Sequence, residues 1–160
     1  MPEKIHDMGY KRILSKKKYF VSLLHDVIRE DRAKDIREED VELIDKEFIL
    51  KDFKDKESDV IYKVKIGKQT VVFYFLLELQ SKVDFTIPFR LLNYILGLYN
   101  RLFQDAGKVR RKKNFRLPVV VPCILYNGVG NWTAARSFRE YLQGGDLFGK
   151  YAIDFRIYPA

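Results

Sequence analysis

Cysteine and histidine are scarce in this chain, and their scarcity limits its chemistry. The 160 residues include one cysteine, Cys123, and two histidines, His6 and His25. A single cysteine excludes an intramolecular disulfide and fits a reducing compartment, so we expect a cytoplasmic protein. Neither histidine is accompanied by a second His or Cys at ligand spacing, which argues against a zinc site. Cys123 stands in the apolar run PVVVPCILY, and we expect both Cys123 and Trp132 to fill the core.

Long apolar runs and secretory signals are missing as well. The longest apolar run, Val71 to Leu79, is less than half of the length that crosses a bilayer. No N-terminal stretch combines the basic flank, apolar core and small-residue cleavage site of a signal peptide. Hydrophobic residues make up 47% of the chain and charged residues 32%, which is typical of a globular domain. The composition therefore argues against disorder and against membrane association.

Positive charge, in contrast, is in excess. The chain has 30 Lys and Arg against 22 Asp and Glu, for a net charge of +8. The excess gathers in two clusters, which comprise Lys11, Arg12, Lys16, Lys17 and Lys18, and Lys108, Arg110, Arg111, Lys112 and Lys113. Such clusters attract a phosphate backbone through counterion release, so we predict that DNA is the partner. A basic surface that is merely solvated stays open as the alternative.

The apolar pattern predicts an α/β fold with a mixed sheet, in a single domain of residues 1–160. Helices are expected over residues 10–29, with a break around the lysine triplet, and over residues 85–103, where Asp84 or Thr86 would provide the cap. The segment 31–40 reads as a charged connector, and residues 41–53 fit either a helix or a short strand. The other predicted elements are a hairpin of 58–66 and 70–80, a strand over 119–126, a short helix over 136–142 and a last strand over 151–158.

The hairpin brings two carboxylates together. Gly67-Lys68-Gln69 supplies the turn, and with a loop of two or four residues Asp59 lies opposite Leu76 or Glu78 on the same face. A buried pair of like charges is costly unless a cation such as Mg²⁺ neutralises it with oxygen ligands. The alternative is a strand end that leaves the sheet and exposes its polar side chains to solvent.

Alternation along the second strand extends this group. Residues two apart point to the same side of a strand, so Gln80 and Lys82 would share the side of Glu78 if the strand continued. Two carboxylates and an amide oxygen would then converge beyond the apolar middle of the hairpin. We predict this end of the hairpin as the functional site.

Two long stretches of the sequence carry a family resemblance: SDVIYKVKIGKQTVVFYFLLELQSKVDFTIPFRLLNYILGLYNR and LPVVVPCILYNGVGNWTAA. They resemble the recombination-promoting nucleases, also called YhgA-like transposases, of the PD-(D/E)XK superfamily. The opening HDMGYKRIL looks like the start of the same family, so the resemblance covers nearly the whole chain. It implies a restriction-endonuclease-like αβ sandwich with a central mixed sheet flanked by helices. It also implies a DNA endonuclease that depends on Mg²⁺ or Mn²⁺ and is associated with recombination or transposition.

Residue by residue, the resemblance makes Asp59 the metal-binding aspartate and Glu78 the second carboxylate. Gln80 stands where many superfamily members have lysine, although members of this family commonly read E-x-Q. An amide cannot supply the positive charge of lysine, so Lys82, or Lys63 on the Asp59 face, is a candidate to replace it. A plain surface role is the alternative for either lysine.

The helix after the catalytic strand carries the next implied positions. Arg90 and Tyr94 resemble the family's R-x-x-x-Y and lie one helical turn apart. Arg90 would hold a phosphate and Tyr94 would position a base or a water, unless the pair only docks the helix onto the sheet. Asp7 matches the first acid of the family, with no role assigned.

Three further expectations stay open at this point. An inactive DNA-binding or assembly module of the same fold is the alternative to the endonuclease, and a homodimer is also considered. Family members are usually longer than this chain, so the question of a missing C-terminal segment stays open.

Overall fold

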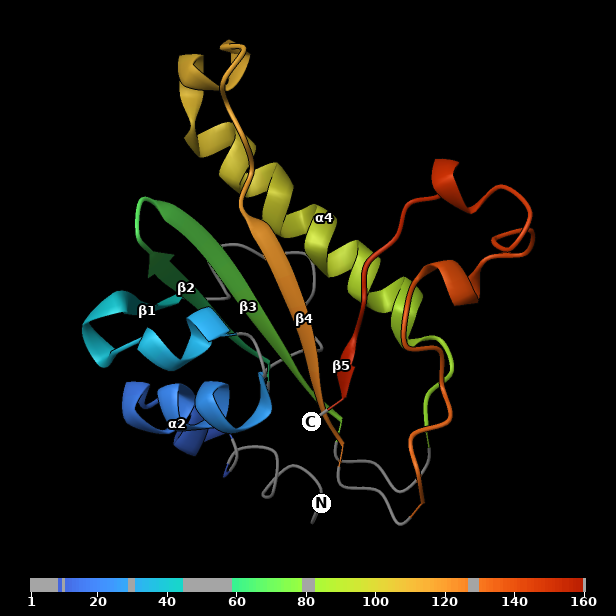
Figure 1. Ribbon diagram of the computed structural model, residues 1–160, viewed down its shortest axis with the longest axis horizontal. Helices are drawn as coiled ribbons and strands as arrows, with labels where there is room; N and C mark the ends of the chain where they lie inside the picture. The colour runs from blue at the N-terminus through green and yellow to red at the C-terminus, as the bar shows by residue number, and fades with distance from the viewer. Residues whose placement is uncertain are drawn as a thin grey trace.

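A computed structural model describes residues 9, 11–28, 31–44, 59–78, 83–126 and 130–159. A five-stranded sheet lies between the helix α2 (Lys17–Val27) on one face and the helix α4 (Ile87–Asp105) on the other (Figure 1). The strands follow the chain order β1-β2-β3-β4-β5. The pairs β1–β2 and β2–β3 are antiparallel, whereas β3–β4 and β4–β5 are parallel. The predicted α/β fold with a mixed sheet between helices is confirmed.

The five strands differ greatly in length. They are β1 (Val41–Ile44), β2 (Val60–Ile66), β3 (Gln69–Glu78), β4 (Val119–Tyr126) and β5 (Tyr158–Pro159). Short 3-10 helices connect them: η1 (Asp31–Asp35), η2 (Glu38–Asp40), η3 (Gly107–Arg111), η4 (Arg139–Tyr141) and η5 (Gly149–Tyr151). No helix within the described ranges is both long and apolar enough to cross a membrane.

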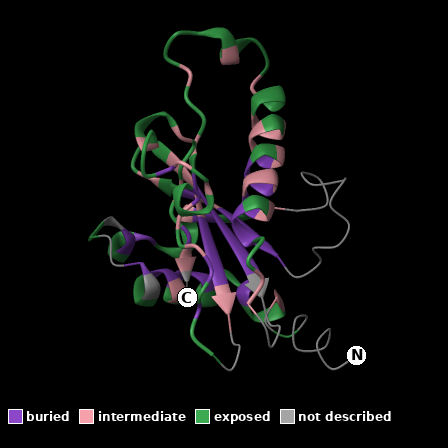
Figure 2. Ribbon diagram, turned by 90° about the vertical axis from the view of Figure 1, so that its right-hand side faces the viewer, coloured by how far each residue is buried: buried purple, intermediate pink, exposed green. Residues whose placement is uncertain are grey.

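The hairpin of β2 and β3 forms the centre of the sheet, as its sequence predicted. Ile66 pairs with Gln69, so the loop holds two residues, Gly67 and Lys68, which is one of the two loop lengths considered, and Gln69 belongs to β3 rather than to the turn. Gly67 has a φ of 63°, and a positive φ at the first central position is typical of a type II′ turn. Strand β3 has a neighbour on each side, and Figure 2 shows these central strands almost wholly buried.

Each face of the sheet builds its own apolar core. On the α2 side the ring of Phe20 stacks on Tyr62 with centroids 3.7 Å apart, and Cys123 packs into the same cluster. Burial raises the pKa of the Cys123 thiol to about 12, so Cys123 fills the core as predicted. On the α4 side Leu91 and Leu98 are fully buried against β3 and β4, and Trp132 belongs to that cluster.

The N-terminal helical region is broken where the lysines begin. Residues 11–14 are helical, the hydroxyl of Ser15 donates to the carbonyl of Lys11, and α2 starts at Lys17. The connector 31–40 forms two 3-10 helices, and the ambiguous segment 41–53 begins as the strand β1; residues 45–53 lie outside the described part.

The C-terminal predictions were largely wrong. Of the strand expected over 151–158 only Tyr158 lies in β5, because the preceding segment pairs with residues 136–138 instead. The amide of Phe138 donates to the carbonyl of Phe155, and the amide of Ile157 donates to the carbonyl of Arg136. Tyr151 is 77% exposed and Ile153 63%, so the first half of this alternating segment buries no face, and burial is reached only at Ile157. The helix expected over 136–142 is reduced to η4, because these backbone bonds hold its first residues in an extended bridge.

Candidate active site

Asp59 is buried at the edge of the sheet where the parallel strands β3 and β4 end. It directly precedes β2, and the register Val60–Phe75, extended by one residue, sets Asp59 opposite Leu76. This is one of the two positions that the turn predicted. Its exposed fraction is 2%, and among the described residues it is the charged side chain that belongs to the buried set. Open α/β sheets bind their ligands outside the carboxyl ends of their strands, which is where Asp59 lies.

Tyr74 holds the carboxylate of Asp59 from the neighbouring strand. The hydroxyl of Tyr74 donates to Oδ2 of Asp59 at 2.6 Å, which confirms that Asp59 lies on the face of the even-numbered residues of β3. Burial, and then the negative charge of Asp59, raise the pKa of Tyr74 far above its ordinary value. The phenol therefore stays protonated and remains a donor at any physiological pH.

Sequence reasoning missed Tyr74, although a signal for it was present. Tyr74 stands two residues before Leu76 on the strand that Asp59 was expected to face, so alternation alone puts it on the same side. In an unbroken apolar run, however, a tyrosine looks like core filling, and its partner is fifteen residues away along the chain.

Tyr94 packs behind this pair. Its ring stacks on Tyr74, with centroids 5.8 Å apart and planes inclined by 5°, and its exposed fraction is 5%. A side chain so deeply buried favours the alternative reading, in which this face of α4 docks onto the sheet. Its predicted contact with DNA stays a prediction that the geometry does not favour.

Arg90 lies one turn before Tyr94, near the start of α4, and its guanidinium forms an ion pair with the carboxylate of Asp84. The other oxygen of Asp84 accepts from the amide and the hydroxyl of Thr86, so Asp84 organises the first turn of the helix. Both side chains of the ion pair are 28% exposed, which leaves Arg90 accessible at the rim. Its phosphate-binding role stays a prediction.

The remaining predicted site residues are only partly described. The backbone of Glu78 pairs with Tyr126 at the end of β3, two positions beyond Leu76; its side chain lies outside the described part. Gln80 and Lys82 also lie outside it, as does the segment 1–8 that contains His6 and Asp7.

Lys63 is on the Asp59 face, as expected, but in the middle of β2 and on the side toward the turn. It is four residues from Asp59, or about 13 Å along an extended chain. The structure therefore removes Lys63 as a substitute for the missing lysine, because its side chain cannot reach Asp59.

The donor set at this edge fits a hard divalent cation. An ionised carboxylate has about four acceptor sites, and Tyr74 occupies one of those on Asp59. Mg²⁺ and Mn²⁺ take carboxylate oxygens and complete their shells with water and phosphate. Within the described ranges no group of three His, Cys, Asp or Glu side chains gathers that could hold a metal. That Asp59 and Glu78 hold such a cation stays a prediction, because the side chain of Glu78 lies outside the described part.

The second basic cluster lies far from this edge. Lys108 to Arg111 belong to η3, which follows the end of α4 (Figure 1). A helix of 19 residues is about 28 Å long, so α4 separates the cluster from the start of the helix near Asp59. Arg110 lies over the ring of Phe103 at 5.0 Å, and the other four basic residues of this cluster are exposed. The first cluster lies on the α2 side of the sheet.

Comparison with known proteins identifies the family of the chain. A family model described as "Putative transposase, YhgA-like" matches residues 4–158. The recombination-promoting nuclease RpnA of Escherichia coli (strain K12) is 36% identical over 83 residues, which are 51% of this chain and 26% of that protein. The matched part therefore spans about a quarter of this curated relative, and no solved structure matches the chain. Since the family model covers nearly all of it, the chain belongs to the YhgA-like transposase family.

Proposed function

We propose that this chain is an endonuclease that hydrolyses phosphodiester bonds of DNA with Mg²⁺ or Mn²⁺, in recombination or transposition. The observation that carries the proposal is the buried carboxylate of Asp59, at the same edge of the sheet where β3 ends in Glu78. The name of the relative in Escherichia coli, a recombination-promoting nuclease, supports it. The excess of positive charge, +8 for the chain, supports a polyanionic substrate.

Each residue at this edge of the sheet would have its own role in cleavage. Asp59 and Glu78 would hold the cation between the strand ends, and Tyr74 would fix the rotamer of Asp59 through its short hydrogen bond. Gln80 would contribute an amide oxygen or N–H toward the same pocket. A divalent cation, when bound, polarises the scissile phosphate and acidifies a water at neutral pH. Lys82 is our candidate for the charge that superfamily members supply with lysine.

Arg90 and the basic clusters would bind the DNA. Arg90, at the rim of the site, would contact the phosphate next to the scissile bond, while its ion pair with Asp84 keeps its side chain in place. The second basic cluster would contact the backbone further along the duplex. Because no base-reading motif accompanies these residues, we expect binding with little sequence preference.

A nicking assay on supercoiled plasmid tests this function. With Mg²⁺ or Mn²⁺ we expect nicked and then linear DNA, and with EDTA the plasmid should stay supercoiled. The matched control is Asp59→Asn, purified in the same way, because residual cutting by that variant would reveal a contaminating nuclease. Plasmid that stays intact in both metals, while the protein retards it on a gel, would favour the alternative of an inactive DNA-binding module.

A further inference from the structure

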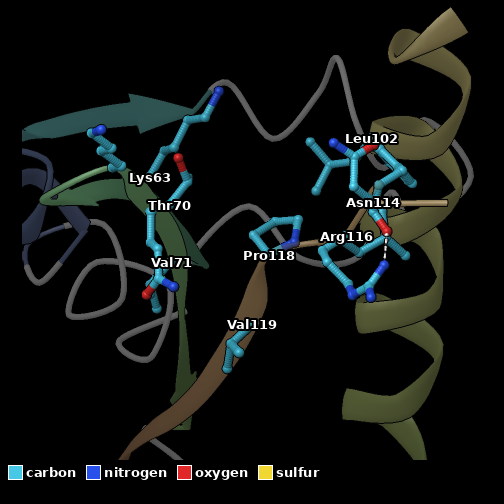
Figure 3. A pocket seen from close by; sticks show the side chains of 12 residues that line it. Lys63, Thr70, Val71, Leu102, Asn114, Arg116, Pro118 and Val119 are labelled. Atoms are coloured by element: carbon cyan, nitrogen blue, oxygen red, sulfur yellow. Dashed lines mark hydrogen bonds between the residues drawn. The ribbon is translucent and has the colours of Figure 1, made fainter. Parts of the chain in front are cut away.

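A cavity of about 580 Å³ opens at the end of the sheet opposite to Asp59. It lies between the hairpin turn of β2 and β3 and the segment 114–118 that leads into β4 (Figure 3). Leu102, in the last part of α4, contributes to its wall. None of the residues proposed to act in cleavage lines it, so it is a site of its own.

The lining of this cavity is basic and holds no acid. It has three cations, Lys63, Lys68 and Arg116, with polar and apolar side chains between them. The cations stand on both sides, with Lys63 on the strand side and Arg116 across from it near α4 (Figure 3). Three positive charges around one hollow repel each other, which favours an anion between them.

No carboxylate in the described ranges forms an ion pair with Lys63, Lys68 or Arg116. The nearest acid in the strand register is Glu42, which lies opposite Lys63 on β1 and makes no such bond. Within the part of the chain that the structure describes, the three cations thus keep their charge available for a ligand.

Two hydrogen bonds to backbone carbonyls fix the orientation of the Arg116 guanidinium. Its Nη1 donates to the carbonyl of Lys113 at 2.9 Å and to that of Phe115 at 2.7 Å. The ring of Phe115 meets the ring of Phe103 edge to face at 6.2 Å, and Arg110 lies over the Phe103 ring. A guanidinium has five N–H donors, so most of them stay available for phosphate oxygens while the backbone fixes the plane.

We infer that this cavity, together with the second basic cluster above it, binds the sugar–phosphate backbone of DNA at a fixed distance from the cut. The inference rests on the proposed function for the position of the cut. The strand β4 joins the two ends of the sheet and has eight residues, so it spans about 26 Å. Successive phosphates of a strand are spaced about 3.4 Å along the axis of B-DNA, so the remote contact falls about eight base pairs from the scissile bond.

The test measures the affinity of the protein for duplex DNA in EDTA. Fluorescence anisotropy gives this affinity at each of a range of salt concentrations. Each phosphate that a variant no longer neutralises should reduce the slope of log affinity against log salt by about 0.9. We expect Lys68→Ala to reduce the slope by about one such step, and Lys68→Ala with Arg116→Ala by about two. Lys68 is exposed in a turn, so its replacement leaves the core intact. Lys34→Ala, which removes an equal charge from η1 on the α2 side, should leave the slope at the wild-type value.

Duplex length adds a second measurement. Wild-type affinity should rise once the duplex extends beyond about eight base pairs on one side of the site, and this rise should be absent from the double variant. An unchanged slope in the double variant, or an equal decrease in Lys34→Ala, would overturn the inference. So would a polyglutamate peptide whose binding, unlike that of DNA, is weakened by Lys68→Ala, because the cavity would then suit an acidic protein. Binding in EDTA needs no cleavage, so a chain that fails to nick plasmid can still pass this test.

Discussion

The Asp59→Asn variant is expected to lose metal-dependent cleavage of DNA, with a rate more than about 100-fold below wild type. Even residues that only support a metal ligand cost about 10–100-fold when they are replaced, and Asp59 would be a ligand itself. The variant replaces a charged oxygen by a neutral amide at nearly the same volume. The measurement is the initial rate of plasmid nicking in saturating Mg²⁺.

The fold should survive this change. The amide oxygen of Asn can still accept the hydroxyl of Tyr74, so the free energy of unfolding in urea should stay close to that of wild type. Asp59→Ala is a poorer variant, because a buried hydroxyl without an acceptor costs about 1–3 kcal/mol. A folded Asp59→Asn protein that cuts at the wild-type rate would contradict the assignment of the site.

The Tyr74→Phe variant is expected to cut about 10–100-fold more slowly at low metal, with much of the rate recovered at high metal. The hydroxyl of Tyr74 holds Oδ2 of Asp59, so without it the carboxylate is less well oriented toward the cation. Tyr74 would act as a positioning residue. Its replacement should therefore raise the metal concentration that gives the half-maximal cleavage rate. The measurement is the cleavage rate as a function of Mn²⁺ concentration.

Tyr62 supplies a matched control for Tyr74. Its hydroxyl is also buried and also donates at 2.6 Å, but to the carbonyl of Leu14 on the opposite face of the sheet. Tyr62→Phe should destabilise the protein by a similar amount, about 1 kcal/mol for one buried hydrogen bond, and leave the metal requirement unchanged. If Tyr74→Phe and Tyr62→Phe raised the metal concentration for half-maximal cleavage equally, the role of Tyr74 would be structural only.

The centre of the fold could be predicted because its signals are local. The glycine at the turn and the two-sided apolar run of β3 fixed both the hairpin and the face that Asp59 shares with Leu76. The loop has two residues, one of the two lengths considered, and only Gln69 differs, since it pairs in the ladder instead of belonging to the turn. Register followed from the turn, and the position of Asp59 followed from the register.

Features that depend on distant pairing were not predictable. Residues 151–157 alternate like a strand, but the last of them bond through Phe155 and Ile157 to residues 136–138 rather than to the sheet. The four-residue strand β1 is too short for periodicity to distinguish it from a helix. The hydrogen bond between Tyr74 and Asp59 was missed for another reason: alternation puts Tyr74 on the face of Asp59, but in an apolar run a tyrosine looks like core filling.

The place of the second basic cluster in the molecule also could not be predicted from the sequence. Sequence identifies its charge but not its distance from Asp59, which depends on α4 running from one end of the sheet to the other (Figure 1). The position of Arg90, by contrast, is set locally, because its ion pair with Asp84 joins residues only six apart.

A crystal structure with Mn²⁺ and a short duplex tests the central claim most directly, because manganese is located by its anomalous scattering. Our account predicts a peak at the carboxyl ends of β3 and β4, with oxygens of both Asp59 and Glu78 at about 2.1 Å. The two carboxylates would then lie within about 5 Å of each other, with the DNA backbone beside the metal. Manganese bound elsewhere, or Asp59 and Glu78 on opposite faces of the sheet, would contradict it.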